Sequence, residues 1–180
     1  NPAMVMIGAS MLWVGWFGFN AGSALAADGN AGMAAVVTHI SAATASLVWM
    51  IMDWSKFGKP TLIGLVTGTI AGLASITPAS GSVGPIGALI IGASAGIICY
   101  LFVNIVKNKL RIDDSLDVFA VHGIGGLIGI LLVAFLVDSN IGGAGYADGL
   151  NAMSQLLIQL KGTFAVLVLS VVASIIITYV

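Results

Sequence analysis

Charged residues are scarce in this chain, and their scarcity excludes several classes of protein. Only 7% of the 180 residues are Asp, Glu, Lys or Arg, whereas soluble domains carry about a quarter. The formal net charge is −1, so the chain lacks the basic surface that nucleic-acid binding requires. Hydrophobic residues make up 59% of the sequence, and the mean hydropathy is +1.11. The chain is therefore expected to be an integral membrane protein with several spans.

Cysteine is almost absent, and the sequence has no recognisable leader segment. Cys99 is the only cysteine and lies within an apolar run, so an internal disulfide framework is excluded and no redox compartment follows. No signal peptide is visible. The chain starts at Asn1 rather than Met and stops at Val180 within an apolar run. We expect it to be an internal portion of a longer protein.

Hydrophobic stretches and glycines are what the sequence has in abundance. An apolar helix of about 20 residues crosses a bilayer core, and 24 glycines suit closely packed membrane helices. We therefore predict an all-α, polytopic membrane protein with one membrane domain over residues 1–180. Its six expected spans lie at about residues 3–26, 33–52, 61–76, 86–106, 113–137 and 156–180.

One of these spans carries a stripe of small residues. Gly64, Gly68 and Gly72 recur every four residues, which places them on one helix face. Small residues let two helix backbones approach closely. We expect this stripe to contact another helix of the same subunit.

The loops differ sharply in charge. Loop 53–60 contains Lys56 and Lys59, and loop 107–114 contains Lys107, Lys109 and Arg111, whereas the intervening loops contain no Lys or Arg. Cytoplasmic loops of membrane proteins carry an excess of basic residues. Loops 53–60 and 107–114 are therefore predicted to be cytoplasmic, and the first span and span 113–137 both run from the inside outward.

A histidine lies within span 113–137. Val118, His122, Gly126 and Gly129 share one predicted helix face, and the two glycines should leave space beside the imidazole. An ionisable group at membrane depth indicates a functional site when it faces a cavity. Alternatively, His122 could simply hydrogen-bond a neighbouring helix.

The start of the same span is rich in carboxylates. Asp114 or Ser115 is expected to cap the helix, with Asp117 in its first turn, where a negative charge is favoured. We prefer this structural role for Asp117 over a catalytic one. An intramembrane enzyme using His122 and Asp117 is disfavoured, because no nucleophile or second metal ligand accompanies them. We therefore expect no enzymatic activity, metal or other cofactor.

Several motifs in a fixed order resemble the ammonium transporter family, in the form typical of Amt rather than Rh proteins. The resemblance covers essentially the whole chain and corresponds to the later six of the family's eleven spans, which form an inverted-repeat fold. It implies a homotrimer in which each subunit has its own narrow hydrophobic pore. The motifs are GWFGFNAGS at 15–23, GKP at 58–60, TPASG at 77–81, DVFAVHG at 117–123 and GGAGYADG at 142–149.

The resemblance also implies roles for individual residues. Ser23 is similar to the hydroxyl that helps bind ammonium in the outer vestibule, and Phe19 to the lower ring of a two-phenylalanine gate. His122 is similar to one of two stacked pore histidines, and Val118 to an apolar pore-lining residue. The family's other pore histidine, upper phenylalanine and vestibule tryptophan belong to earlier spans, which these 180 residues do not include.

Three further side chains near these positions are assigned less specifically. Trp16 and Asn20 are expected to belong to the vestibule or to be structural. The surroundings of His39 do not match the family's second histidine motif. We interpret His39 as a helix-packing residue.

The expected function is the passage of ammonium or ammonia across the cell membrane, through vestibule capture, deprotonation and movement past His122. The alternative is an ammonium sensor of the same fold joined to a cytoplasmic signalling domain. The resemblance further suggests a cytoplasmic regulatory partner of the PII class.

Overall fold

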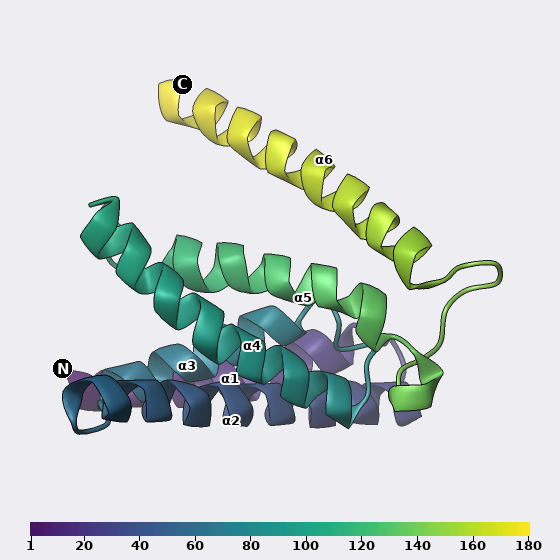
Figure 1. The fold of residues 1–180 in the computed structure, drawn as a ribbon, viewed down its shortest axis with the longest axis horizontal. Coiled ribbons are helices and arrows are strands. Elements are labelled where there is room, and N and C mark those ends of the chain that lie inside the picture. Colours follow the sequence, from purple (N-terminus) through teal and green to yellow (C-terminus); the bar gives the residue numbers. More distant parts are fainter.

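Six α-helices run back and forth along one common direction in the computed structural model, which describes residues 1–180 (Figure 1). Five helical segments are long and apolar enough to cross a bilayer, whereas α3 has only 15 residues. The predicted all-helical class is confirmed. The helices are α1 (Pro2–Gly22), α2 (Gly29–Phe57), α3 (Leu62–Ile76), α4 (Pro85–Asn104), α5 (Ile124–Leu136) and α6 (Ala152–Tyr179).

Capping residues rather than hydrophobicity set the helix ends. The Asp28 side chain accepts hydrogen bonds from the backbone N–H groups of Asn30 and Ala31 and starts α2, and the Asn151 side chain starts α6 in the same way. Gly58 ends α2 in the left-handed region at φ 71°, where a side chain is disfavoured.

Several predicted boundaries are wrong for this reason. Helix α2 covers 29–57 rather than 33–52, so residues 53–57 of the expected loop 53–60 are helical. Helix α1 ends four residues before the predicted boundary, at Gly22 rather than at residue 26. A turn of π-helix, η1 (Ile105–Lys109), extends α4 into the expected loop 107–114. Helix α6 begins at Ala152 rather than near residue 156.

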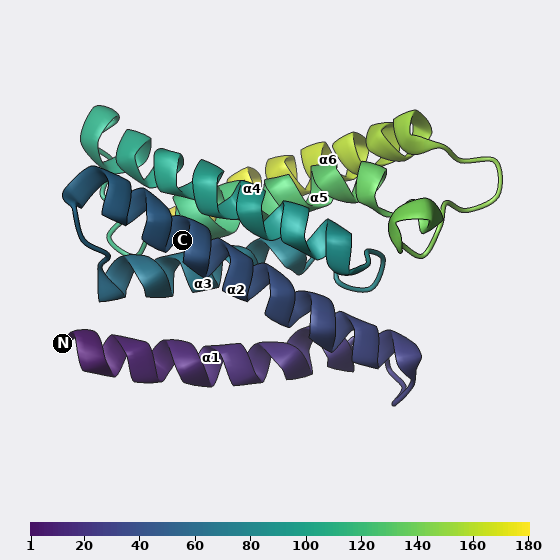
Figure 2. The same cartoon turned by 60° about the horizontal axis from the view of Figure 1, so that its bottom comes forward.

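Helix α2 lies at the centre of the bundle, with α3 and α4 packed against it (Figure 2). A Cβ atom at Gly68 of α3 would lie 2.6 Å from the Trp49 Cβ, and one at Gly72 2.5 Å from the Ser41 carbonyl oxygen. On α4, a Cβ at Gly92 would lie 2.6 Å from that same oxygen. The glycine stripe of α3 therefore contacts a helix of its own chain, as predicted.

Replacing Gly68 by Leu is expected to destabilise the protein without separating subunits. The new side chain meets Trp49 and the Ala45 carbonyl oxygen, and overpacking of this kind costs about 1–3 kcal/mol. Thermal unfolding in detergent and size-exclusion chromatography measure the two effects. Gly18→Leu is the matched control, because nothing lies within 4 Å of a Cβ at Gly18. An unchanged melting temperature for Gly68→Leu contradicts the prediction.

Helix α5 packs closely against α3. A Cβ atom at Gly125 would lie 2.7 Å from the Ser75 Oγ, and one at Gly129 would collide with the Ser75 carbonyl oxygen. Of the three glycines in α5, only Gly126 has nothing within 4 Å of its Cβ position. The prediction that Gly129 leaves room beside His122 is therefore wrong, because Gly129 is occupied in helix contact.

Helix α6 lies apart from this bundle. It diverges from α5 along its length (Figure 1), and none of its residues is buried. Its contacts within the chain are made chiefly with α5.

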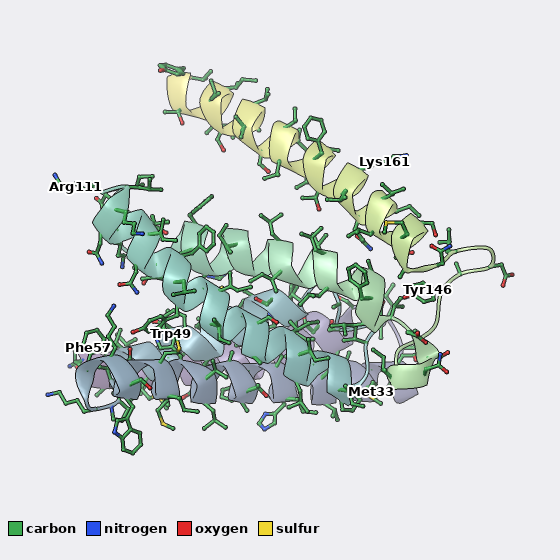
Figure 3. All side chains as sticks on the ribbon, viewed as in Figure 1. Met33, Trp49, Phe57, Arg111, Tyr146 and Lys161 are labelled. Carbon is green, nitrogen blue, oxygen red and sulfur yellow. The ribbon has the colours of Figure 1, made fainter.

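The two basic segments lie at the same end of the bundle. Figure 3 shows Phe57 and Arg111 at one end and Met33 and Tyr146 at the other. The Lys56 Nζ donates a hydrogen bond to the Asn104 Oδ1 at 3.1 Å, which joins the ends of α2 and α4 directly.

Candidate functional site

The histidine segment begins with a turn of π-helix, η2 (Val118–Gly123), which leads directly into α5. The Asp114 carboxylate accepts hydrogen bonds from the backbone N–H groups of Val118 and Phe119 at 2.8 and 3.0 Å. The Ser115 hydroxyl instead donates to Asp113. Of the two predicted caps, Asp114 is therefore the one used. The predicted helix start at residue 113 is wrong, because 113–117 form the loop that carries this cap.

Asp117 holds the loop to the neighbouring π turn. It lies in the left-handed region at φ 57°, and its carboxylate forms an ion pair with the Lys107 Nζ at 2.8 Å. Asp117 therefore precedes the helix rather than occupying its first turn, and the expected helix-dipole role is wrong. The ion pair with Lys107 is the contact that the structure gives this carboxylate.

His122 of η2 meets α1 at Trp16. The imidazole stacks on the indole with ring centroids 6.4 Å apart and an interplanar angle of 20°. The indole N–H donates to the Thr77 Oγ1 at 2.7 Å, which fixes the ring between α1 and the end of α3. His122 itself remains exposed within this chain. Within this chain, an aromatic wall therefore lies on one side of the imidazole, and the residue as a whole is exposed.

Phe19 continues this wall. Its ring meets Trp16 edge-on, with centroids 6.3 Å apart and an interplanar angle of 82°, and 61% of the residue is exposed. Phe19 and Trp16 also line a cavity of about 760 Å³ along one face of α1, where Gly8 and Gly15 leave room. This cavity is an apolar groove that leads along α1 past the two aromatic rings.

Ser23 lies at the far end of the same helix face. The spacings from Ser23 to Phe19 and from Phe19 to Trp16 are four and three residues, so the three side chains follow one another on one face. Seven residues of helix separate Ser23 from Trp16 by about 10 Å. Trp16 therefore lies at the depth of His122 and not beside Ser23.

The Ser23 hydroxyl has a defined orientation. It donates its hydrogen bond to the Phe19 carbonyl oxygen at 2.7 Å. Because a hydroxyl has one donor and two acceptor positions, the exposed Ser23 oxygen is left to accept from another donor. Such an oxygen suits a small N–H cation.

Asn20 points away from this row of residues. Its amide donates to the Thr38 Oγ1 at 2.9 Å, and only 5% of the residue is exposed. This burial and the bond to Thr38 favour the structural alternative for Asn20. Val118 precedes His122 by one turn and is 54% exposed, so it lies at the open side of η2.

His39 belongs to a different surface. Its ring lies 5.2 Å from that of Trp13 and 6.1 Å from that of Phe17, measured between centroids. It links α2 to α1 through ring contacts, which agrees with the predicted packing role. No group of three or more His, Cys, Asp or Glu side chains comes together as a metal site.

Sequence reasoning missed two partners at this site. Thr77 lies 61 positions from Trp16, and no local spacing connects them. Lys107 indicates only membrane topology when the sequence is considered alone, whereas in the structure it pairs with Asp117. The TPASG motif at 77–81 is the only feature of the sequence that draws attention to Thr77.

Comparison with known proteins gives a consistent result. The model of the Ammonium Transporter Family matches residues 1–180. The chain belongs to the ammonium transporter family. Among its relatives, ammonium transporter Amt1 of Archaeoglobus fulgidus is 52% identical over 156 residues, which are 87% of this chain and 39% of that protein.

Solved structures of ammonium transporter family members share the fold. Candida albicans Mep2 aligns with a TM-score of 0.86 and 38% identity over 98% of this chain and 40% of its own. A structure described as a sensor Amt protein aligns with a TM-score of 0.83 and 34% identity over 92% of this chain and 40% of its own. The chain thus spans about 40% of the length of these members of the ammonium transporter family.

Proposed function

We propose that the protein carries ammonium or ammonia across the membrane, along a path that passes Ser23, Phe19 and His122 in that order. The observation that carries this proposal is the stacking of His122 on Trp16, at the end of an open apolar groove. The matched relatives are themselves named ammonium transporters. No step of this function requires an enzyme's nucleophile or a cofactor.

The geometry suggests how each residue acts. The Ser23 oxygen accepts a hydrogen bond from ammonium at the outer vestibule, and the neighbouring aromatic faces attract the cation by about 0.5–2 kcal/mol. A cation loses its hydration on entering the apolar groove, which favours release of one proton from NH4⁺ to give NH3. NH3 then passes Phe19 and moves along His122 and Val118. An imidazole ring can accept a proton at one nitrogen and donate one from the other, so His122 can pass on the proton released from NH4⁺.

Reconstitution of the purified protein in vesicles tests this function. Uptake of labelled methylammonium, an ammonium analogue, should exceed that of protein-free vesicles and should be reduced by competing ammonium. Uptake equal to that of protein-free vesicles contradicts transport.

The second candidate is an ammonium sensor, favoured by the match to the sensor Amt protein. A signalling domain attached after α6 would lie at the end where Phe57 and Arg111 lie (Figures 1 and 3). A sensor should bind ammonium, as measured by calorimetry, without mediating flux in the vesicle assay. A transporter should show both.

The proposed setting is the cell membrane, with 53–60 and 107–114 on the cytoplasmic side and three copies in a homotrimer. The clustering of basic residues at one end supports this orientation. A regulatory protein of the PII class would then approach from that end.

Cysteine labelling tests the orientation. Single cysteines at Lys59, Asn108 and Ser139 in a Cys99→Ala background should react differently with a membrane-impermeant thiol reagent in intact cells. Only the cysteine at position 139 should be labelled. Labelling at 59 or 108 in intact cells reverses the proposed topology, and labelling of all three after lysis is the control for accessibility.

A further inference from the structure

A second cavity lies at the basic end of the bundle, away from the groove of α1. It has a volume of about 560 Å³ and lies between the end of α2 and the α4–η1 segment. Lys56 and Lys109 line it together with Ser55 and Asn104, and its apolar lining includes Met52 and Leu101. No residue of the proposed transport path contributes to it.

The positive charges in this cavity have no anionic partner in the chain. The only salt bridge joins Lys107 to Asp117, and neither residue lines the cavity. Asp53 is the nearest acidic residue along α2, but it is buried and accepts the hydrogen bond of the Thr61 hydroxyl at 2.5 Å. Lys56 and Lys109 are both exposed. Neither lysine of the cavity therefore forms a salt bridge within the chain.

Neutral groups hold Lys56 in position. Its Nζ donates to the Asn104 Oδ1 at 3.1 Å and lies 5.6 Å from the centroid of the Tyr100 ring. The Asn104 amide in turn donates to the Tyr100 carbonyl oxygen. An ammonium group has three donors, so two remain for a ligand.

The π turn brings the second lysine to the same place. Hydrogen bonds in η1 run from i to i+5, as between the Ile105 carbonyl and the Leu110 N–H at 2.9 Å. With more than four residues per turn, Lys109 lies above Asn104 and Ile105. An ordinary α-turn would rotate Lys109 further from Asn104.

The surface below the lysines is apolar and continues towards the membrane centre. Ile97 and Leu101 follow one another on α4 with 44% and 48% of their surfaces exposed, and Ile51 of α2 is 57% exposed. The spacing of Ile97, Leu101 and Ile105 places them on one face. A ligand with an anionic head and hydrocarbon chains fits this arrangement, because it would contact both the lysines and the apolar surface. A free anion would contact the lysines alone.

We propose that this cavity binds the headgroup of an anionic phospholipid, with its phosphate between Lys56 and Lys109 and its acyl chains along Ile51, Ile97 and Leu101. Basic pockets between membrane helices on the cytoplasmic side recognise such headgroups. The same chemistry could admit inorganic phosphate, and the experiment separates the two.

Native mass spectrometry of the purified protein in neutral detergent tests the proposal, with phosphatidylglycerol and phosphatidylcholine as probes. Phosphatidylglycerol should bind more tightly than phosphatidylcholine, and the double variant Lys56→Gln/Lys109→Gln should weaken its binding roughly thirtyfold. The matched control is Lys59→Gln/Arg111→Gln, which removes the same charge from the same end outside the cavity and should retain binding.

Three results would overturn the proposal. Equal binding of phosphatidylglycerol and phosphatidylcholine would show that the negative charge of the headgroup does not contribute to binding. An equal loss in the control double variant shows a general surface attraction rather than a site. Full displacement of phosphatidylglycerol by millimolar inorganic phosphate shows that the ligand is a free anion. Lys56→Arg/Lys109→Arg should keep the preference for phosphatidylglycerol, so a failure to fold in the Gln variant would not hide the answer.

Discussion

Replacing His122 by Leu is expected to reduce ammonium uptake by about ten- to a hundredfold while leaving the fold intact. A hydrogen bond involving a charged group contributes about 1.5–3 kcal/mol, which corresponds to that range when it is lost from a barrier. The fold should persist because His122 is exposed and its ring contact within the chain is with Trp16, against which Leu can also pack. Uptake in vesicles and ammonium-evoked current measure the effect.

The other histidine of the chain provides the control. His39→Leu removes an imidazole that contacts Trp13 and Phe17, away from the groove of α1. It should leave uptake within about twofold of the parent protein, since surface changes away from a site have small effects. Parental uptake and current in His122→Leu would remove His122 from the proposed path, and equal losses in both variants would point to a general defect.

Replacing Phe19 by Ala is expected to lower the discrimination between ammonium and potassium by roughly two- to thirtyfold. That range corresponds to the loss of a cation–π attraction of about 0.5–2 kcal/mol, and the smaller side chain also widens the groove. The loss of stability should be smaller than the 3–5 kcal/mol typical of a buried Phe→Ala, because 61% of Phe19 is exposed. Potassium and ammonium currents recorded from the same membranes measure the ratio.

Phe17→Ala is the matched control for Phe19. It removes the same ring from the same helix, but at a position that contacts His39 instead of Trp16. Selectivity should stay at the parental value in this variant. A parental current ratio in Phe19→Ala would exclude a gating role for that ring.

The sequence predicted the helices well because their signals are local. Hydrophobic runs identified six helices, and the spacing of Gly64, Gly68 and Gly72 predicted a contact that the structure places against α2. Helix ends were predicted poorly. Hydropathy falls where polar residues begin, but the backbone hydrogen bonds of the helix continue past that point. Lys56 is polar yet helical, since α2 continues until Gly58 adopts φ 71°.

The residues of the candidate site could be predicted from the sequence, but their contacts with one another could not. The order of Ser23, Phe19 and Trp16 along α1 follows from helix spacing. In contrast, the stacking of Trp16 on His122 joins segments more than a hundred residues apart. The burial of Asn20 against Thr38 likewise depends on how α1 packs on α2, which no single-helix pattern contains.

The π turn at the start of α5 should make this part of the chain tolerant to the loss of one residue. Such a turn holds one residue more than an α-turn in the same hydrogen-bonded ladder. Deleting a single residue within 119–121 would let regular α-helix continue backwards from Ile124, leaving the contacts of Gly125 and Gly129 with Ser75 in place. Because a regular α-turn would take the place of the wider turn, the segment before the deletion would keep its orientation, and the ion pair of Asp117 with Lys107 would persist. A one-residue deletion there would therefore replace the wide turn while the chain on both sides of it kept its place in the bundle.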